Sequence, residues 1–247
     1  MYKFNSRIRY SEVDSKGNLS LESLLDYFQD CSTFHSEDVG VGLEYLEKRH
    51  LAWVLSAWQI VTERYPRLGE NVTIGTAPYD FRGFFGYRNF LMESEQGERL
   101  ACANTLWTLM DMENMHPARP TKEMLAAYRM EEKLPMDYAS RKITLPASGG
   151  MEAEILEVKR YHLDTNNHVN NGQYIRIALG CLPEKYFEKG FSVRQMRAEY
   201  KRQAHLKDRM YPIIYENGEV AAISLNNEEG QPYCIVELEF TEMGEKS

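Results

Sequence analysis

The stretch that decides the fold is Arg9–Phe28, RYSEVDSKGNLSLESLLDYF, because a second stretch of the chain repeats its pattern. Lys159–Ala178, KRYHLDTNNHVNNGQYIRIA, lies over it at a shift of 150 residues without a gap, and Asp14 falls on Asp164. In both copies a polar loop leads into apolar residues at helical spacing. An internal duplication of this kind indicates that the chain builds the same architectural unit twice.

Each copy is followed by segments of strand character. The first half predicts a helix over 21–34 and then four strands, with the turn EQGE between the last two as a hairpin signal: 51–63, 72–81, 84–94 and 99–111. The second half predicts a helix over 169–179 and again four strands: 191–203, 209–216, 219–226 and 232–240. One helix followed by an antiparallel sheet, twice over, predicts an α+β protein with helices packed on sheets.

A connector separates the two halves. Residues 115–150 carry four prolines and end in PASGG, with one amphipathic piece at 121–133. We therefore expect an N-terminal domain at 1–135, a linker at 136–150 and a C-terminal domain at 151–247. Within the first domain, FRGFFGYR with Gly83 and Gly86 suggests a strand with a bulge rather than a phosphate-binding loop.

Composition narrows the classes of function. The chain has 247 residues, 43% hydrophobic and 27% charged, as a globular protein of one large or two modest domains would. A formal net charge of −8 counts against nucleic acid as a partner. The N-terminus has no apolar signal region, and no stretch approaches the roughly 20 apolar residues that span a bilayer. We expect a cytoplasmic protein that binds no membrane.

Cysteine and histidine spacing gives no support for a metal or a cofactor. The four cysteines form no CxxC pair and lie in no nucleophile motif, which favours small buried hydrophobic residues: Cys31, Cys102, Cys181 and Cys234. The histidines form no HxxxH or HxH pair, and there is no GxSxG, P-loop or GxGxxG motif. Whatever chemistry the chain performs is expected to use its own side chains.

Charge is unevenly spread along the chain. From Lys159 to Arg209 there are eleven Lys or Arg against five Asp or Glu, while residues 210–247 carry eight Glu and one Lys. A basic stretch in an acidic protein could dock an acidic partner. A solvated face is the ordinary alternative for such a charge cluster.

The loop before the second helix carries the strongest chemical signal. It places Asp164, Asn166 and His168 directly ahead of a helix, whose first N–H groups can face a ligand oxygen. Hydrolysis of an activated acyl bond needs a base for water and donors for the oxyanion, and histidine titrates near neutrality. A polar loop with a helix cap is the simpler interpretation. However, the first copy has Asn18 where the second has His168, a difference that capping alone does not require.

The loop and helix motifs of both halves resemble those of a known family. LDTNNHVNNGQYI, residues 163–175, resembles the LDxNxHVNNxxY signature of plant and bacterial acyl-acyl carrier protein thioesterases. Residues 9–30 resemble the N-terminal start of the same enzymes, and the similarity runs over essentially the whole chain. The resemblance implies two fused hot-dog domains, each an antiparallel sheet wrapped around a central helix. It further implies hydrolysis of fatty acyl-carrier thioesters without cofactor or metal, with an acidic acyl carrier protein as the partner.

The resemblance also assigns roles to residues. It implies that the N-terminal domain binds the acyl chain and that the C-terminal domain is catalytic, with Asp164, Asn166 and His168 as catalytic residues. The family has a Glu-Cys pair some 35 residues later, where this chain has Gln203 and Ala204. Ala204 excludes a cysteine nucleophile there, and Gln203 can position a water but cannot act as a base. Glu199 is the other candidate to replace the family's glutamate.

Three readings of function remain open from the sequence. An acyl-CoA thioesterase would act on the same bond with a different carrier. A non-catalytic acyl-binding or regulatory hot-dog protein is favoured by the loss of the Glu-Cys pair and opposed by the intact Asp164, Asn166 and His168. A monomer and a homodimer are both compatible with a tandem chain, because it already contains the pairing that single hot-dog chains obtain by dimerising.

Overall fold

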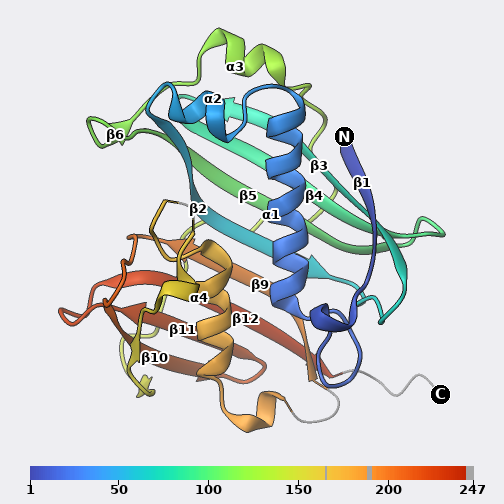
Figure 1. Cartoon of the computed structure of the whole chain (residues 1–247). Helices are drawn as coiled ribbons and strands as arrows, with labels where there is room; N and C mark the ends of the chain where they lie inside the picture. Colours follow the sequence, from blue (N-terminus) through green and yellow to red (C-terminus); the bar gives the residue numbers. More distant parts are fainter. Residues whose placement is uncertain (165, 188–190, 243–247) are drawn as a thin grey trace. The chain divides into compact units, whose positions relative to one another are not determined.

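The computed structural model describes residues 1–164, 166–187 and 191–242. The chain forms two compact units, and the boundary after the first falls at Tyr138. Unit 1 comprises Met1–Ser56 and Ile60–Tyr138, and unit 2 comprises Ala57–Gln59 and Ala139–Ser247. Figure 1 shows the long helix of unit 1 in blue and the shorter helix of unit 2 in orange, each with its strands.

Unit 1 is built on an antiparallel arrangement of long strands. The strands follow the order β1-β3-β4-β5-β2, with β1 antiparallel to β3, β3 to β4 and β4 to β5. Its elements are β1 (Tyr2–Arg7), α1 (Leu21–Asp38), α2 (Leu43–Glu47), β2 (Leu51–Thr62), β3 (Asn71–Arg82), β4 (Phe85–Ser94), β5 (Arg99–Asp111), β6 (His116–Pro117) and α3 (Lys122–Ala127).

Helix α1 is positioned by a cap, an apolar stripe and a glycine. Ser20 accepts a hydrogen bond from the Ser23 N–H, which satisfies one donor of the first turn. One face buries residues at helical spacing against β3 and β1: Leu21, Leu24, Leu25, Phe28 and Cys31. Burying each large apolar side chain stabilises the fold by about 1.5–3 kcal/mol. The helix ends where Gly40 takes φ +77°, and the Val41 N–H bonds back to the Ser36 carbonyl.

Unit 2 repeats this plan with a shorter helix. The strand order is β9-β12-β11-β10-β7, with every neighbouring pair antiparallel, and β8 also pairs with β10. Helix α4 packs against β11 and β12. The elements are β7 (Met151–Glu152), β8 (Leu156–Glu157), α4 (Asn171–Gly180), β9 (Phe191–Tyr200), β10 (Arg209–Asn217), β11 (Val220–Asn226) and β12 (Pro232–Glu242).

The alternation seen in the last strand is confirmed. Val236, Leu238 and Phe240 are all buried, at 0%, 0% and 3% exposure. On the opposite face, Glu237 forms an ion pair with Arg197, with 2.6 Å between Oε1 and Nη1. Side chains alternate between the two faces of a strand, so this strand is half core and half surface.

The expected α+β fold class is confirmed, because each unit has antiparallel strands and a packed helix. The differences lie at element ends. Strand β1 is absent from the sequence prediction, which starts at the first helix. Its residues nevertheless alternate in burial. Strand β9 ends at Tyr200 rather than at Gln203. The connector contributes Ile143 to the core of unit 2, at 3% exposure.

The expected bulge at Gly83 is wrong. Gly83 and Phe84 form the two-residue turn between β3 and β4, and Gly83 takes φ +64°, which such hairpin turns favour. The irregularity in the pairing of these strands lies between Pro78 and Asp80 instead. The glycine is therefore required by the turn and not by a bend within the strand.

Candidate active site

The loop ahead of α4 in unit 2, which carries Asp164, Asn166 and His168, is held by hydrogen bonds of Asp164. Oδ1 of Asp164 accepts hydrogen bonds from the backbone N–H groups of Asn166, at 2.8 Å, and His168, at 3.2 Å. The Asp164 N–H donates to the His168 carbonyl at 2.8 Å, and Asn167 takes φ +60°, a conformation that Asn tolerates better than most residues. The aspartate thus holds the histidine through the backbone.

Two further contacts join this loop to its surroundings. Asn170 caps α4 by accepting a hydrogen bond from the Gly172 N–H at 2.9 Å. The Val169 N–H donates to the Ala204 carbonyl at 2.9 Å, and the Ala204 N–H donates to the Tyr174 hydroxyl at 2.9 Å. These bonds bring the segment after β9 directly against the loop and the first turns of α4.

His168 is half-buried, and its ring meets the ring of His205 edge to face. The centroids are 4.9 Å apart and the planes make an angle of 77°. Burial lowers the pKa of His168, and nearby His205 lowers it further, while the charge of Asp164 acts in the opposite direction. The imidazole therefore stays neutral to lower pH than an ordinary histidine does, and a neutral imidazole can accept a proton.

The remaining predicted site residues lie at the surface or in the core. Asn166 and Gln203 are both exposed, and Gln203 immediately precedes Ala204, whose carbonyl the loop binds. Glu199 is buried at 4% exposure, and its carboxylate accepts bonds from the Ile143 N–H at 3.1 Å and from Lys201 Nζ at 2.8 Å. Glu199 is thus engaged in holding the connector, so the exposed Gln203 is the better candidate to face a substrate.

His205 lies against His168 but is not among the site residues predicted from the sequence, where histidine spacing bears only on metal binding. Its position directly after the Gln203-Ala204 pair, where this chain departs from the family's Glu-Cys pair, is the signal in the sequence. Within the described residues, no group of three or more His, Cys, Asp or Glu side chains is arranged to hold a metal ion. Cys31, Cys102 and Cys234 are buried and Cys181 is half-buried, and burial raises the pKa of each thiol.

The same backbone arrangement occurs in unit 1 without a histidine. There Oδ1 of Asp14 accepts from the N–H groups of Lys16 at 2.9 Å and Asn18 at 3.0 Å. Gly17 takes φ +78° where unit 2 has Asn167 at φ +60°. The fold therefore builds this loop twice, and only the second copy carries an imidazole.

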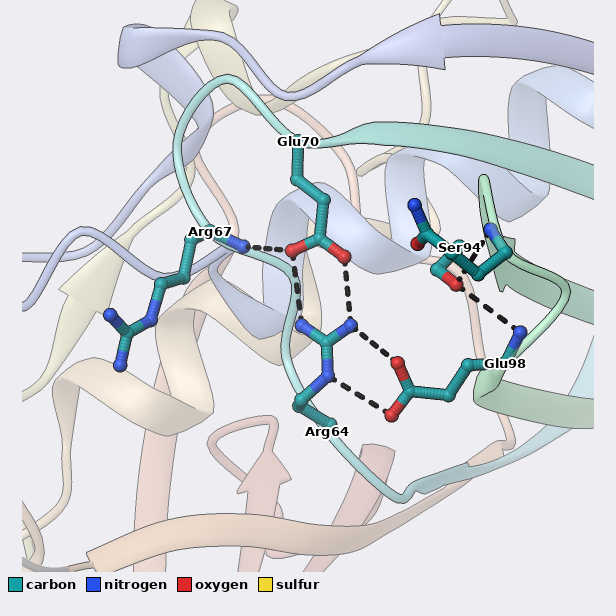
Figure 2. Close-up of polar contacts among 6 residues, drawn as sticks. Arg64, Arg67, Glu70, Ser94 and Glu98 are labelled. Carbon is teal, nitrogen blue, oxygen red and sulfur yellow. Dashed lines mark hydrogen bonds and ion pairs between the residues drawn. The ribbon is translucent and has the colours of Figure 1, made fainter. Parts of the chain in front are cut away.

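In unit 1, the turn that contains Arg67 and Glu70 is closed by ion pairs of Arg64 (Figure 2). Arg64 donates to both oxygens of Glu70, at 3.0 and 2.8 Å, and to both oxygens of Glu98, at 3.2 and 2.7 Å. The Arg67 N–H also donates to Glu70, at 3.0 Å. The hydrogen bonds with Arg64 lower the pKa of Glu70, as expected for a two-pronged ion pair.

The counterpart of this turn in unit 2 also has an acidic residue three positions after its first backbone donor. The His205 N–H donates to Asp208 Oδ2 at 2.8 Å, as the Arg67 N–H does to Glu70. Hence one turn is closed by an arginine between two carboxylates, and the other presents a histidine beside the loop of His168.

The duplicated helix-on-sheet units, with a histidine loop at the start of the second helix, define a tandem hot-dog protein. The chain belongs to the acyl-ACP thioesterase family. Residues 1–128 match the model of the acyl-ACP thioesterase N-terminal domain, and residues 148–242 match that of the C-terminal domain. The expected resemblance is confirmed.

Individual relatives agree with this assignment. The palmitoyl-acyl carrier protein thioesterase of Arabidopsis thaliana is 24% identical over 216 residues, which cover 82% of this chain and 52% of that protein. The chain thus spans about half the length of the curated relatives it matches.

Solved structures share the fold. An acyl-ACP thioesterase from Bacteroides thetaiotaomicron has a TM-score of 0.88 at 21% identity, with 96% of each chain covered. The 12:0-ACP thioesterase from Umbellularia californica has a TM-score of 0.87 at 22% identity, with 98% of each covered. No helix among the described residues is long and apolar enough to cross a membrane.

Proposed function

We propose that this protein hydrolyses the thioester of fatty acyl-acyl carrier protein, releasing free fatty acid and the carrier. The observation that carries the proposal is His168, half-buried on a loop fixed by Asp164, with a pKa lowered mainly by burial. Membership of the acyl-ACP thioesterase family and the names of its relatives support the substrate class. The proposed reaction uses no cofactor.

The proposed reaction is direct attack by water. His168 accepts a proton from a water molecule while the water oxygen bonds to the thioester carbonyl carbon. Asn166 donates to the carbonyl oxygen as it gains negative charge. The carbon–sulfur bond then breaks, and the proton on His168 passes to the departing sulfur. The products are a carboxylic acid and a thiol, so the atoms balance.

Gln203 is assigned the positioning of the attacking water. It is exposed, and Ala204 after it is bonded to the loop of His168. An amide can both donate to and accept from water, although it cannot take a proton. Glu199 is not given this role, because its carboxylate is buried against Ile143 and Lys201.

The two halves are assigned different tasks. In the proposal, residues 1–135 bind the acyl chain, 136–150 link the halves and 151–247 carry out the chemistry. The family models, which match residues 1–128 and 148–242 separately, support this division.

An acidic carrier is proposed to dock on the basic part of unit 2. Of the cations there, Arg197 pairs with Glu237 and Lys201 with Glu199. Arg202, Lys207 and Arg209 are exposed, so their charges are the better candidates for the carrier. The double charge reversal of Arg202 and Lys207 should raise KM for the carrier-bound substrate while sparing a short-chain CoA thioester. Equal KM changes for both substrates would contradict the assignment.

A released-thiol assay tests the function and separates it from its alternatives. Carrier and CoA thioesters of several chain lengths are compared, because the relatives' names include palmitoyl, oleoyl and 12:0 chains. We expect turnover of the carrier thioesters and a loss of about 10²–10⁴ in kcat for His168→Ala. His50→Ala, an exposed histidine of unit 1, is the control. Faster turnover of CoA thioesters would favour the acyl-CoA alternative, and tight acyl binding without turnover would favour a regulatory protein.

Cell location and assembly belong to the same proposal. We propose a cytoplasmic enzyme, monomer or homodimer, whereas the plant relatives are named as chloroplastic. Cell fractionation and light scattering of the purified protein test these two points.

A further inference from the structure

A second histidine–aspartate pair stands beside the proposed base. The ring of His205 lies edge to face on that of His168, with 4.9 Å between centroids. Oδ2 of Asp208 accepts a hydrogen bond from the backbone N–H of His205 at 2.8 Å. The same oxygen lies 3.7 Å from ring Nδ1 of His205. The Tyr233 hydroxyl donates to the same Oδ2 at 3.3 Å. The backbone of His205 is therefore held by Asp208, and its ring packs against the ring of His168.

We propose that His205 is a positioning residue of the thioesterase site, which fixes the imidazole of His168 by ring contact and, when protonated, keeps that imidazole neutral. The inference rests on the proposed function, since it assigns a task within the same hydrolysis. It goes beyond the roles given to Asp164, Asn166 and Gln203.

The ring of His168 needs such a contact. Among the described residues, the hydrogen bonds of the Asp164 carboxylate go to backbone N–H groups of the loop and not to the imidazole. The backbone of His168 is thus fixed while its ring is oriented by packing. An edge-to-face arrangement of two aromatic rings is a favoured geometry and restricts both side chains.

Charge provides the second part of the task. Two charged groups act on His168: Asp164 on its own loop, which favours the imidazolium, and His205 on the segment after β9, which opposes it. Asp208 and, through it, Tyr233 of β12 face His205. Two positive rings this close repel each other, so the pair holds one proton more readily than two. A positive charge on His205 therefore opposes the imidazolium of His168 and favours its neutral form.

The first unit shows that the fold does not require this pair. There Asn18 stands at the position of His168 and Arg67 at that of His205, and the two form an isolated β-bridge. The turn beside them is closed by Arg64 between Glu70 and Glu98 instead (Figure 2). Because unit 1 forms the equivalent aspartate loop with other side chains, that loop does not need facing histidines to fold.

Two substitutions separate the ring from its charge. His205→Phe keeps an aromatic edge but cannot be protonated, and His205→Lys keeps a charge without a ring. His50→Phe is the matched control, since His50 is exposed with its ring 4.0 Å from a carboxylate oxygen of Glu113 in unit 1. The full-length protein is used, and the His168 ring is titrated by NMR alongside the pH–rate profile for carrier thioesters.

The expected shifts have opposite signs. His205→Phe should raise the His168 midpoint, and move the acid limb of the rate profile to higher pH, with little change in the plateau rate. His205→Lys should lower the midpoint and reduce the plateau rate by about tenfold, because the ring contact is lost. His50→Phe should change neither quantity.

The outcomes distinguish this inference from the function on which it rests. An active enzyme whose His168 midpoint is the same in all variants, or whose rate falls equally at every pH, overturns the role of His205 alone. A wild-type protein that hydrolyses neither carrier nor CoA thioesters refutes the hydrolase, and with it the catalytic setting of the pair, whatever the titration shows.

Discussion

Removing the Asp164 carboxylate should separate the stability of the loop from its chemistry, because the chain contains a matched control. Asp164→Ala deletes an oxygen that accepts two backbone N–H groups, at 2.8 and 3.2 Å, and Asp14→Ala deletes the equivalent oxygen of unit 1, at 2.9 and 3.0 Å. Losing a side-chain acceptor for backbone N–H groups should cost about as much as losing a helix cap, about 0.5–2 kcal/mol. Both variants should therefore lose a similar free energy of unfolding.

Their activities should differ sharply. In Asp164→Ala the loop no longer holds the His168 backbone, so we expect kcat to fall by about 10²-fold or more, within the range for losing a general base. Asp14→Ala should keep nearly wild-type kcat. Urea denaturation followed by tryptophan fluorescence gives the stabilities, and released thiol at saturating carrier thioester gives kcat.

Asp164→Asn decides how the aspartate acts. An asparagine oxygen can still accept both N–H groups, so the loop should persist without the charge. If Asp164 works through the backbone, as its contacts indicate, this variant should keep most of the activity. An Asp164→Asn protein as inactive as Asp164→Ala would refute that reasoning, and so would equal losses of kcat in Asp14→Ala and Asp164→Ala.

Three other predictions follow from the same structure. Gln203→Glu should retain or raise kcat, because it restores the family's acidic residue beside the loop; a loss as large as that of His168→Ala would contradict the water-positioning role. Burial lowers the pKa of His35 to about 4, from an ordinary 6.5, so its contribution to stability is present above pH 6.5 and is lost as pH falls towards 4, by up to about 3 kcal/mol. His35→Gln, which keeps an acceptor for Arg88, should show a weaker loss over that range in denaturation at pH 4 and 7, and an unchanged pH dependence would count against it. Arg64→Met should destabilise the protein by about 1 kcal/mol while leaving kcat unchanged, as measured by denaturation and released thiol; a large kcat loss in a stable variant would be inconsistent with a structural role.

Features that depend on neighbours in sequence could be read directly. The repeat at a shift of 150 residues, the apolar stripe of α1 and the alternation along β12 are local patterns, and each corresponds to an element of the structure. The turn that Asp164 makes is also local, because its carboxylate bonds to N–H groups at most four residues away. Local geometry follows from residue type, since caps, turns and periodicities are decided within one or two turns of the chain.

Element ends were harder to read. The sequence extended β9 to Gln203, but the strand ends at Tyr200, and the following backbone groups bond to the Tyr233 carbonyl and to the loop of His168. Gln203 therefore lies beyond the end of β9. Its distance from Glu199 is not that of two residues four apart on a straight strand. Glu199 looked available in sequence and is instead buried against Ile143, which lies 56 residues earlier.

By itself, the sequence determined that the chain folds one helix-and-sheet unit twice and that only the second copy carries a histidine before its helix. Tertiary structure alone decided that His205 lies on His168 and that Arg64 of unit 1 also binds Glu98. The physical reason is separation along the chain. His168 and His205 meet because the Val169 N–H binds the Ala204 carbonyl after a helix and a whole strand have intervened, and no local pattern specifies that register.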